Sequence, residues 1–230
     1  SKIYLNNGKG EFQQSISLPL EKNAQVSVIL AHDVDQDGLV DLMVGGRNIA
    51  GKYGQLPRSY LLKNLGQNRY QDITNQIAPE LANLGLVKDA AWTDIDADGT
   101  QDLIVIGEWM PITIFLTKNG KLVNETARFG LDNSNGWWSS IAVEDFNQDG
   151  FPELVVGNLG LNNRLKPSAE FPIKMVVADF DKNGTSEQII SYPVDGSYFT
   201  VATKDELVKQ IPILKKDFVR YNDFAGKTVD

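Results

Sequence analysis

Four short segments of the chain carry acidic or amide side chains at alternate positions, followed by a glycine and a further acid. They begin at Asp33, Asp94, Asp145 and Asp179 and share the pattern D-x-[DN]-x-[DN]-G-x-x-[DE]. Side-chain oxygens at positions 1, 3 and 5 of such a tight loop point inward, and glycine at position 6 permits a sharp turn that a Cβ would strain. The pattern therefore predicts oxygen-lined sites for a hard divalent cation.

Calcium is the cation that this set of ligands favours, because Ca²⁺ takes about six to eight oxygen ligands and Mg²⁺ keeps several waters instead. Position 7 can add a backbone carbonyl oxygen, and the acid at position 9 closes the coordination shell. We therefore expect up to four Ca²⁺ ions. The predicted ligands, loop by loop, are Asp33, Asp35, Asp37, Leu39 and Asp41; Asp94, Asp96, Asp98, Thr100 and Asp102; Asp145, Asn147, Asp149, Phe151 and Glu153; and Asp179, Asp181, Asn183, Thr185 and Glu187.

The loops differ from EF-hands, which need a bidentate Glu at position 12 and flanking helices. Position 12 is here occupied by aliphatic residues of predicted strands, namely Val44, Val105, Val156 and Ile190. A single acidic turn would most simply be a solvated loop, but four copies in one setting favour cation binding. The third and fourth loops use Asn147 and Asn183 in place of an acid, so we expect weaker binding there.

The composition excludes several other classes of protein. A formal net charge of −8 argues against nucleic acid or an anionic membrane as the main partner, and fourteen of the 30 carboxylates lie in the four loops. The absence of cysteine excludes thiol catalysis, zinc–thiolate sites and disulfides. The one histidine, His32, excludes a multi-histidine metal site. No apolar run approaches the roughly 18 residues of a membrane-spanning helix.

Short apolar runs, mostly β-branched, flank the loops and are typical of β-strands. Residues 26–31 precede the first loop, and residues 42–45 follow it. Asn/Gly turns that suit β-hairpins, such as those at Gly8 and Gly120, alternate with the loops. This repeat predicts an all-β chain of four-stranded antiparallel blades, as in a β-propeller.

The spacing of loops and hairpins divides the chain into segments. We expect an outer hairpin of a preceding blade, then three blades, then a helical excursion, at residues 1–20, 21–78, 79–130, 131–202 and 203–230. The fourth loop begins 34 residues after Asp145, too early to open another blade. It is expected to replace the outer hairpin turn of the third blade, so that residues 175–178 pair with the strand around residues 188–192.

The C-terminal stretch changes to a helical period. Thr203 and Glu206 form a capping-box signature, and apolar residues follow at helical spacing from Leu207 to Phe218. Pro212 is expected to split this helix, because proline lacks a backbone N–H and clashes with the preceding turn.

Three and a half blades leave two open sheet edges, which proteins usually avoid. A closed propeller needs at least four blades. We therefore expect the remaining blades to come from a longer parent chain or from a partner chain.

The loops and hairpins resemble FG-GAP or VCBS repeats, which form the propellers of integrin α-subunits and occur in many bacterial secreted proteins. Residues 33–45, 94–107 and 145–157 carry this resemblance, together with hairpins such as residues 4–12. Further segments look closest to the bacterial cartilage-acidic-protein-like group, related to proteins with an ASPIC/UnbV tail: residues 107–111, 136–139, 157–163 and 204–216. The resemblance implies a propeller, often seven-bladed, that is exported from the cell and holds calcium in its blade loops.

We expect a calcium-binding module that binds or assembles with a protein or glycan outside the cell, in the periplasm or on the outer cell surface. A carbohydrate-active enzyme of the lyase type and a purely structural scaffold are the alternatives. No catalytic constellation is recognisable, so we expect no enzyme. Trp92, Trp109, Trp137 and Trp138 could stack on carbohydrate, although packing between blades is the simpler role. His32 is expected to be a strand-end residue beside the first loop.

Overall fold

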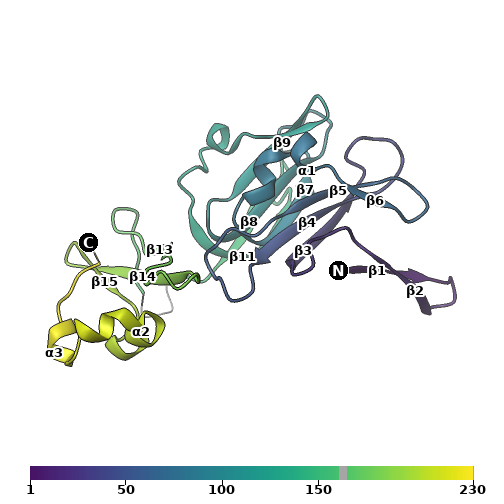
Figure 1. Ribbon diagram of the computed structural model, residues 1–230. Coiled ribbons are helices and arrows are strands. Elements are labelled where there is room, and N and C mark those ends of the chain that lie inside the picture. Colours follow the sequence, from purple (N-terminus) through teal and green to yellow (C-terminus); the bar gives the residue numbers. More distant parts are fainter. Residues whose placement is uncertain (161–164, 230) are drawn as a thin grey trace. The chain divides into compact units, whose positions relative to one another are not determined.

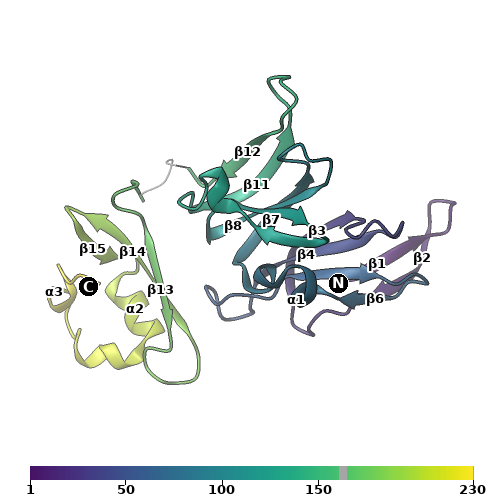
Figure 2. The ribbon, with the colours of Figure 1, turned by 90° about the horizontal axis from the view of Figure 1, so that it is seen from above.

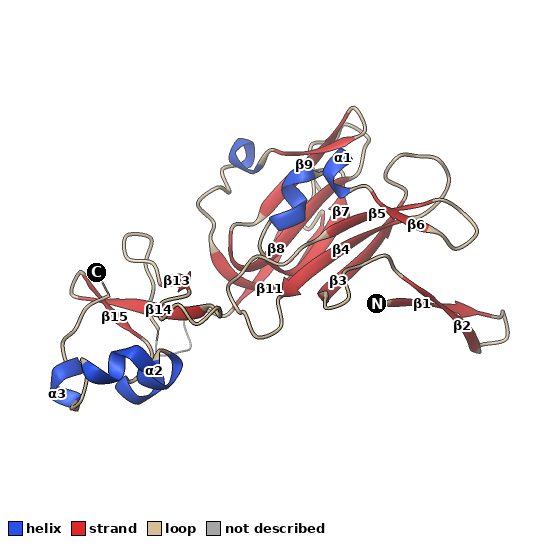
Figure 3. Cartoon of the chain, in the orientation of Figure 1, coloured by secondary structure: helices blue, strands red, loops and turns tan. Residues whose placement is uncertain are grey.

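The computed structural model describes residues 1–160 and 165–229. The chain divides into two compact units. The first comprises Ser1–Ile49 and Leu56–Leu159, and the second comprises Ala50–Gln55 and Gly160–Asp230. Strands make up most of the regular structure in the first unit, whereas the longest helix lies in the second (Figure 3).

The first unit contains a complete four-stranded antiparallel sheet (Figure 1). Its strands are β3 (Gln25–His32), β4 (Asp41–Asn48), β5 (Tyr60–Asn64) and β6 (Tyr70–Asp72), in that order across the sheet. Exposure alternates along β3, whereas the first six residues of β4 are all buried. The strand next to the sheet's edge is thus covered on both faces, which accounts for its continuous apolar run.

A second sheet repeats this arrangement and then extends it. The strands β7 (Leu86–Thr93), β8 (Asp102–Met110), β9 (Thr113–Lys118) and β10 (Lys121–Asn124) pair as consecutive antiparallel neighbours. The end of β8 reaches beyond β9 and pairs there with β11 (Gly136–Glu144), which in turn pairs with β12 (Glu153–Asn158). Backbone hydrogen bonds therefore join two successive repeats into one six-stranded sheet.

Short elements complete the first unit. The hairpin of β1 (Lys2–Asn6) and β2 (Phe12–Ser17) precedes the first sheet. Helical turns follow the sheets' outer strands at α1 (Thr74–Ile77), η1 (Pro79–Asn83) and η2 (Thr126–Phe129).

Three apolar clusters show that successive layers of the first unit pack face to face. The first sheet packs on the second through residues such as Met43, Leu61 and Leu103. The other face of the first sheet carries a cluster that Leu18 and Ile3 of the N-terminal segment join. The other face of β8 and β9 packs on side chains of β11 and β12, which belong to the next repeat of the same sheet. Strand β8 contributes alternate residues to the two clusters on its two faces, as the pleat of a strand requires.

The second unit is a three-stranded antiparallel sheet followed by short helices (Figure 2). Its strands are β13 (Lys174–Ala178), β14 (Glu187–Val194) and β15 (Ser197–Thr200). The helical elements are α2 (Lys204–Gln210), η3 (Pro212–Lys216) and α3 (Tyr221–Phe224). Helix α2 is tied to the sheet by a hydrogen bond from the Gln210 side-chain amide to the Gln188 carbonyl oxygen, at 2.9 Å.

The expected pairing around the fourth loop is confirmed. Met175 pairs with Ile190 and Ala178 pairs with Glu187, so β13 and β14 form the hairpin that the loop closes. The expected third blade, residues 131–202, is distributed over two sheets: β11 and β12 continue the second sheet, while β13, β14 and β15 form their own. Because β13 starts 16 residues after the end of β12, these strands are not joined by a tight turn. The division of the chain into blades stays a prediction, and the described residues form no closed ring.

The predicted helix start at Thr203 is confirmed. The Thr203 hydroxyl accepts a hydrogen bond from the Glu206 backbone N–H at 3.4 Å, and the Glu206 carboxylate accepts one from the Thr203 N–H at 2.8 Å. Pro212 divides the helical stretch, since α2 ends at Gln210 and a 3₁₀ helix begins at the proline. Leu207 and Ile211 are buried, as intramolecular packing of this face requires.

Replacing Thr203 with alanine removes the hydroxyl that caps α2. We expect local stability of α2 to fall by about 1 kcal/mol, the usual value of such a cap. Hydrogen–deuterium exchange of the backbone amides between residues 204 and 212 measures this directly. Thr203→Ser, which keeps the hydroxyl, is the control and should exchange like the parent chain. Equal exchange in Thr203→Ala and the parent would show that tertiary packing alone holds the helix.

Candidate metal sites

Each acidic loop connects two neighbouring antiparallel strands. The first three loops join β3 to β4, β7 to β8 and β11 to β12 in the first unit. The fourth loop joins β13 to β14 in the second unit. The strand–loop–strand setting inferred from the sequence is therefore confirmed at all four positions.

The four loops share one backbone conformation. Glycine at position 6 has φ between 85° and 92° in every loop, which only glycine adopts without strain. The residue at position 4 is also left-handed in every loop although it is never glycine, with φ between 58° and 63° at Gln36, Ala97, Gln148 and Lys182. Sequence reasoning missed this second constraint, because position 4 has no common residue type.

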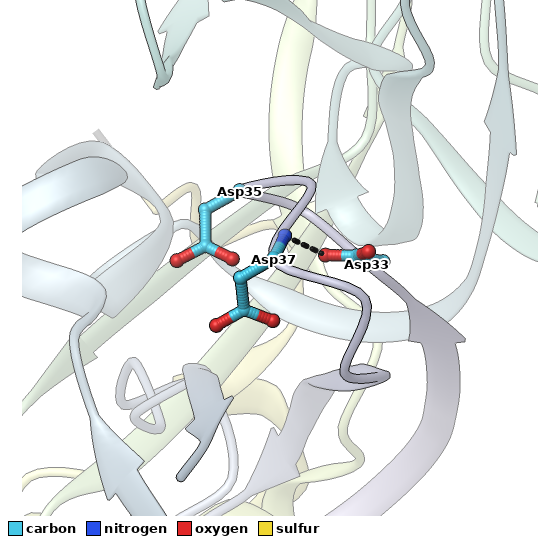
Figure 4. A group of neighbouring side chains, drawn as sticks. All are labelled: Asp33, Asp35 and Asp37. Carbon is cyan, nitrogen blue, oxygen red and sulfur yellow. Dashed lines mark hydrogen bonds between the residues drawn. The ribbon is translucent and has the colours of Figure 1, made fainter.

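The aspartate at position 1 shapes the turn. In the first loop, Asp33 accepts hydrogen bonds from the backbone N–H groups of Asp37 at 3.1 Å and Gly38 at 2.8 Å. Figure 4 shows this first bond beside the carboxylate of Asp35. The equivalent pairs of bonds recur at Asp94, Asp145 and Asp179, with lengths from 2.8 to 3.1 Å. Position 1 therefore orders the backbone as well as offering oxygen.

The side chain at position 5 closes a smaller turn. Asp37 accepts a hydrogen bond from the Leu39 N–H at 2.9 Å, and the same bond forms at the other three loops. These bonds use the N–H group at position 7 and leave the carbonyl oxygen of that residue out of the turn. The coordinating role expected for the carbonyls of Leu39, Thr100, Phe151 and Thr185 stays a prediction.

The acid at position 9 links each loop to the sheet. Asp41 and Asp102 are 1% exposed, and each accepts a backbone N–H from position 2 of its own loop. Their second oxygens accept the N–H groups of Asn64 at 2.7 Å and Thr117 at 2.8 Å, on the next strand of each sheet. In the third and fourth loops, Glu153 and Glu187 make the same bond to position 2, at 2.8 and 3.1 Å.

Burial changes the pKa of the acids at position 9 of the first two loops. Desolvation raises the pKa of Asp41 and of Asp102, and the backbone hydrogen bonds oppose this effect. Solvent-exposed members of the loops shift the other way. A hydrogen bond from Lys63 is the main cause of the lowered pKa of Asp37, and the Thr100 hydroxyl has that role at Asp98.

The predicted ligands converge in each loop, though not all together. One oxygen from each of three acids lies within 4.8 Å of the others in every loop. The groups are Asp33, Asp35 and Asp37; Asp94, Asp96 and Asp102; Asp145, Asp149 and Glu153; and Asp179, Asp181 and Glu187. Asp41 and Asp98 are not among these groups. The Asn147 side-chain amide donates to Asp149 at 3.1 Å and to Glu153 at 2.9 Å, and the Asn183 side-chain oxygen accepts the Thr185 N–H at 2.8 Å. The role of these two amides as ligands stays a prediction.

Two basic side chains that the sequence did not single out lie against the first two loops. Lys63 of β5 contacts both Asp35 and Asp37, the latter at 2.9 Å. Arg128 of η2 lies 3.0 Å from one oxygen of Asp96. Both come from segments that follow the loop by more than 20 residues, so only the folded sheet brings them there.

The second loop offers a direct test of fit for a cation. The Oδ1 atom of Asp96 is buried and has no hydrogen-bond partner among the residues that the structure describes. A buried carboxylate oxygen without a donor is costly unless a cation contacts it. Together with Asp94 and Asp102, this oxygen forms an all-oxygen set that suits calcium.

The histidine and two of the tryptophans that the sequence analysis considered pack against other side chains. His32 ends β3, and its ring centroid lies 4.8 Å from that of Trp92, which is on strand β7 of the second sheet. Trp92 and Trp138 pack against apolar clusters. No described helix is long and apolar enough to span a membrane.

The fold and loops together define a mainly β protein built of antiparallel sheets with an acidic loop between paired strands. Comparison with protein families agrees with this class: the model of the FG-GAP-like repeat matches residues 94–156. The match begins at the first ligand of the second loop and ends after the third loop, so it covers β8 to β11 entire. No curated protein matches the chain.

Replacing Asp102 with alanine should destabilise the first unit even in the presence of a chelator. The change leaves the N–H groups of Ile95 and Thr117 without their acceptor, and we expect a loss of about 2–4 kcal/mol in the free energy of unfolding. Urea unfolding followed by tryptophan fluorescence reports on this unit, because all four tryptophans belong to it.

The matched control is Asp96→Ala in the same loop. In the described part of the chain Asp96 accepts no backbone N–H of its loop, and its ion-pair partner Arg128 is exposed. The loss of stability of Asp96→Ala in chelator should therefore stay below about 1 kcal/mol. Equal losses for the two variants would contradict the division into a structural acid and a ligand acid.

Proposed function

We propose that this chain is a calcium-binding segment of a β-propeller that serves binding or assembly outside the cell, with calcium in a structural role. The observation that carries the proposal is the four-fold recurrence of one loop conformation, with three acids converging in each copy. An accidental acidic turn has no reason to repeat the same two left-handed residues and the same hydrogen bonds in four places.

Electrostatics supports the same conclusion. Each loop concentrates three or four carboxylates on a short connection, and these carboxylates repel one another when ionised. Four Ca²⁺ ions would add eight positive charges, equal in size to the formal net charge of −8. Because the ions would bind the folded loops and not the unfolded chain, their binding free energy would add to stability.

The proposed location follows from the repeat type and from the cation. FG-GAP-like repeats are usual in extracellular and surface-exposed proteins, and one is matched here. Extracellular sites can be filled with a dissociation constant of about 10⁻⁴ to 10⁻³ M, which suits loops that carry amide ligands. We therefore place the protein on the outer cell surface, in the periplasm or outside the cell.

The proposal also covers the subgroup of the repeat family and the source of the blades that would close the propeller. Within the FG-GAP/VCBS repeats, we place the chain nearest the cartilage-acidic-protein-like group. The stacking of the β1–β2 hairpin, the first sheet and the second sheet is the arrangement of consecutive blades. The remaining blades would come from the parent chain or a partner chain, and the role is binding rather than catalysis.

Counting calcium tests the proposal. Isothermal titration and native mass spectrometry should find up to four ions, and calcium should raise the thermal midpoint where magnesium does not. Asp35 and Asp96 lie at position 3 and take no part in the loop-forming hydrogen bonds of positions 1 and 9. Alanine there should remove a ligand without disrupting the loop, so Asp35→Ala and Asp96→Ala should each lose one ion. Asp132→Asn, which removes one exposed charge outside the loops, is the control and should keep all ions. Unchanged stoichiometry in both loop variants would refute the sites.

Lys63 provides a test specific to the first loop. Its ammonium group contacts two of the three acids that would hold the ion, so it competes with calcium for their oxygens. Lys63→Met should tighten calcium binding at the first loop severalfold, most clearly at low ionic strength. Lys118→Met, whose partner Glu125 lies outside the loops, should leave calcium affinity unchanged. Weaker calcium binding in Lys63→Met would show that the lysine supports the site.

A further inference from the structure

Two of the four tryptophans lie at the end of the sheet that is opposite the acidic loops. Strand β8 begins at Asp102, the last acid of the second loop, and Trp109 is the penultimate residue at its other end. Trp137 is the second residue of β11, whose other end leads into the third loop. Both tryptophans therefore lie a strand's length from the proposed calcium sites.

The two indole rings pack against each other outside the apolar clusters of the core. Their centroids are 5.4 Å apart and their planes are inclined by 39°. Both residues are partly buried, so part of each side chain reaches the surface. The apolar clusters of the described residues include Trp92 and Trp138 but neither Trp109 nor Trp137.

Trp109 is held in a strained backbone conformation. Its φ is +64°, a value that a bulky residue rarely adopts and that costs about 1–3 kcal/mol. Its neighbours enforce the conformation, because Glu108 pairs with Leu86 on one side and with Trp137 on the other, and Met110 pairs with Gly136. Glycine would satisfy this position without strain. An indole retained at such a cost points to a role for the ring itself.

Polar groups border the indole pair. Glu108 is the cross-strand partner of Trp137, so the two side chains leave the same face of the sheet. Lys88 lies 3.0 Å from the Glu108 carboxylate, and the two side chains are 24% and 15% exposed. The Asn158 side-chain oxygen accepts the backbone N–H of Trp137 at 3.3 Å. The border therefore offers donors and acceptors while its ion pair is electrically balanced.

We propose that Trp109 and Trp137 bind a neutral oligosaccharide by stacking on the apolar face of its pyranose rings. A pyranose combines a flat C–H surface with a rim of hydroxyl groups, which matches partly exposed indoles flanked by hydrogen-bonding side chains. The balanced Lys88–Glu108 pair and the net charge of −8 disfavour an acidic sugar. This inference rests on the proposed role as an extracellular binding module and names the class of its ligand.

The test is titration of the chain with cellohexaose, xylohexaose and mannohexaose, followed by calorimetry and by tryptophan fluorescence. At least one of these neutral hexasaccharides should bind and perturb the fluorescence. Trp109→Gly and Trp137→Ala should each weaken that binding at least about tenfold, as the loss of an aromatic contact predicts. Tyr4→Ala, which removes an exposed aromatic ring from the β1–β2 hairpin, should bind like the parent.

Trp109→Gly separates a binding role from a structural one. If the ring serves binding, relief of the positive φ should leave the unfolding midpoint equal to or above that of the parent while saccharide binding is lost. If the ring serves only packing, this variant should unfold more easily, and the proposal fails. Saccharide binding that is unchanged in both tryptophan variants, or absent from the parent with all three hexasaccharides, also overturns it.

Calcium stoichiometry measured on the same samples keeps the two proposals apart. Four bound ions without saccharide binding would refute the ligand assignment and leave the calcium sites intact. Saccharide binding that depends on Trp109 and Trp137 in a chain that binds no calcium would refute the metal sites and support the indole pair.

Discussion

In every acidic loop, carboxylates accept hydrogen bonds from backbone N–H groups and hold the loop against the strands that it connects. The acid at position 1 folds each loop, and the acid at position 9 fastens it to the paired strands, with Asp41 and Asp102 reaching a further strand of their sheets. These bonds order the connection through the polypeptide's own groups. They also gather negative charge, which Lys63 and Arg128 offset at the first two loops. A bound calcium ion would neutralise the negative charge that these two side chains leave.

Strand β8 connects the second acidic loop to the core of the first unit. Its alternate side chains enter the apolar clusters on both faces, and its backbone pairs with three other strands. One end carries Asp102 of the second acidic loop, and the other carries Trp109 in its strained conformation. A single buried strand thus separates a proposed stabilising site from a proposed binding site. Calcium could support saccharide binding only through the rigidity of this strand, since the two sites share no residue.

The two units show how one loop type serves different surroundings. In the first unit the loops connect paired strands of sheets that stack face to face, and in the second the same loop closes a hairpin of a three-stranded sheet to which helix α2 is hydrogen-bonded. The loop conformation is unchanged, with φ of 88° at Gly99 and at Gly184. Its geometry is therefore a property of the local sequence, whereas the surrounding sheet decides how deeply the acid at position 9 is buried and which basic side chains reach the loop.

The strands, the acidic loops, the pairing around the fourth loop and the capped helix at Thr203 could be predicted from the sequence. These features depend on residue types a few positions apart, where alternation, turn glycines and capping side chains act locally. Tertiary structure alone decided that Asp41 and Asp102 would be buried, and that Lys63 and Arg128 would reach the loops. It also decided that Trp109 and Trp137 would leave the core that Trp92 and Trp138 join. Each of these outcomes depends on strand register and on the packing of residues distant in sequence, which no local pattern encodes.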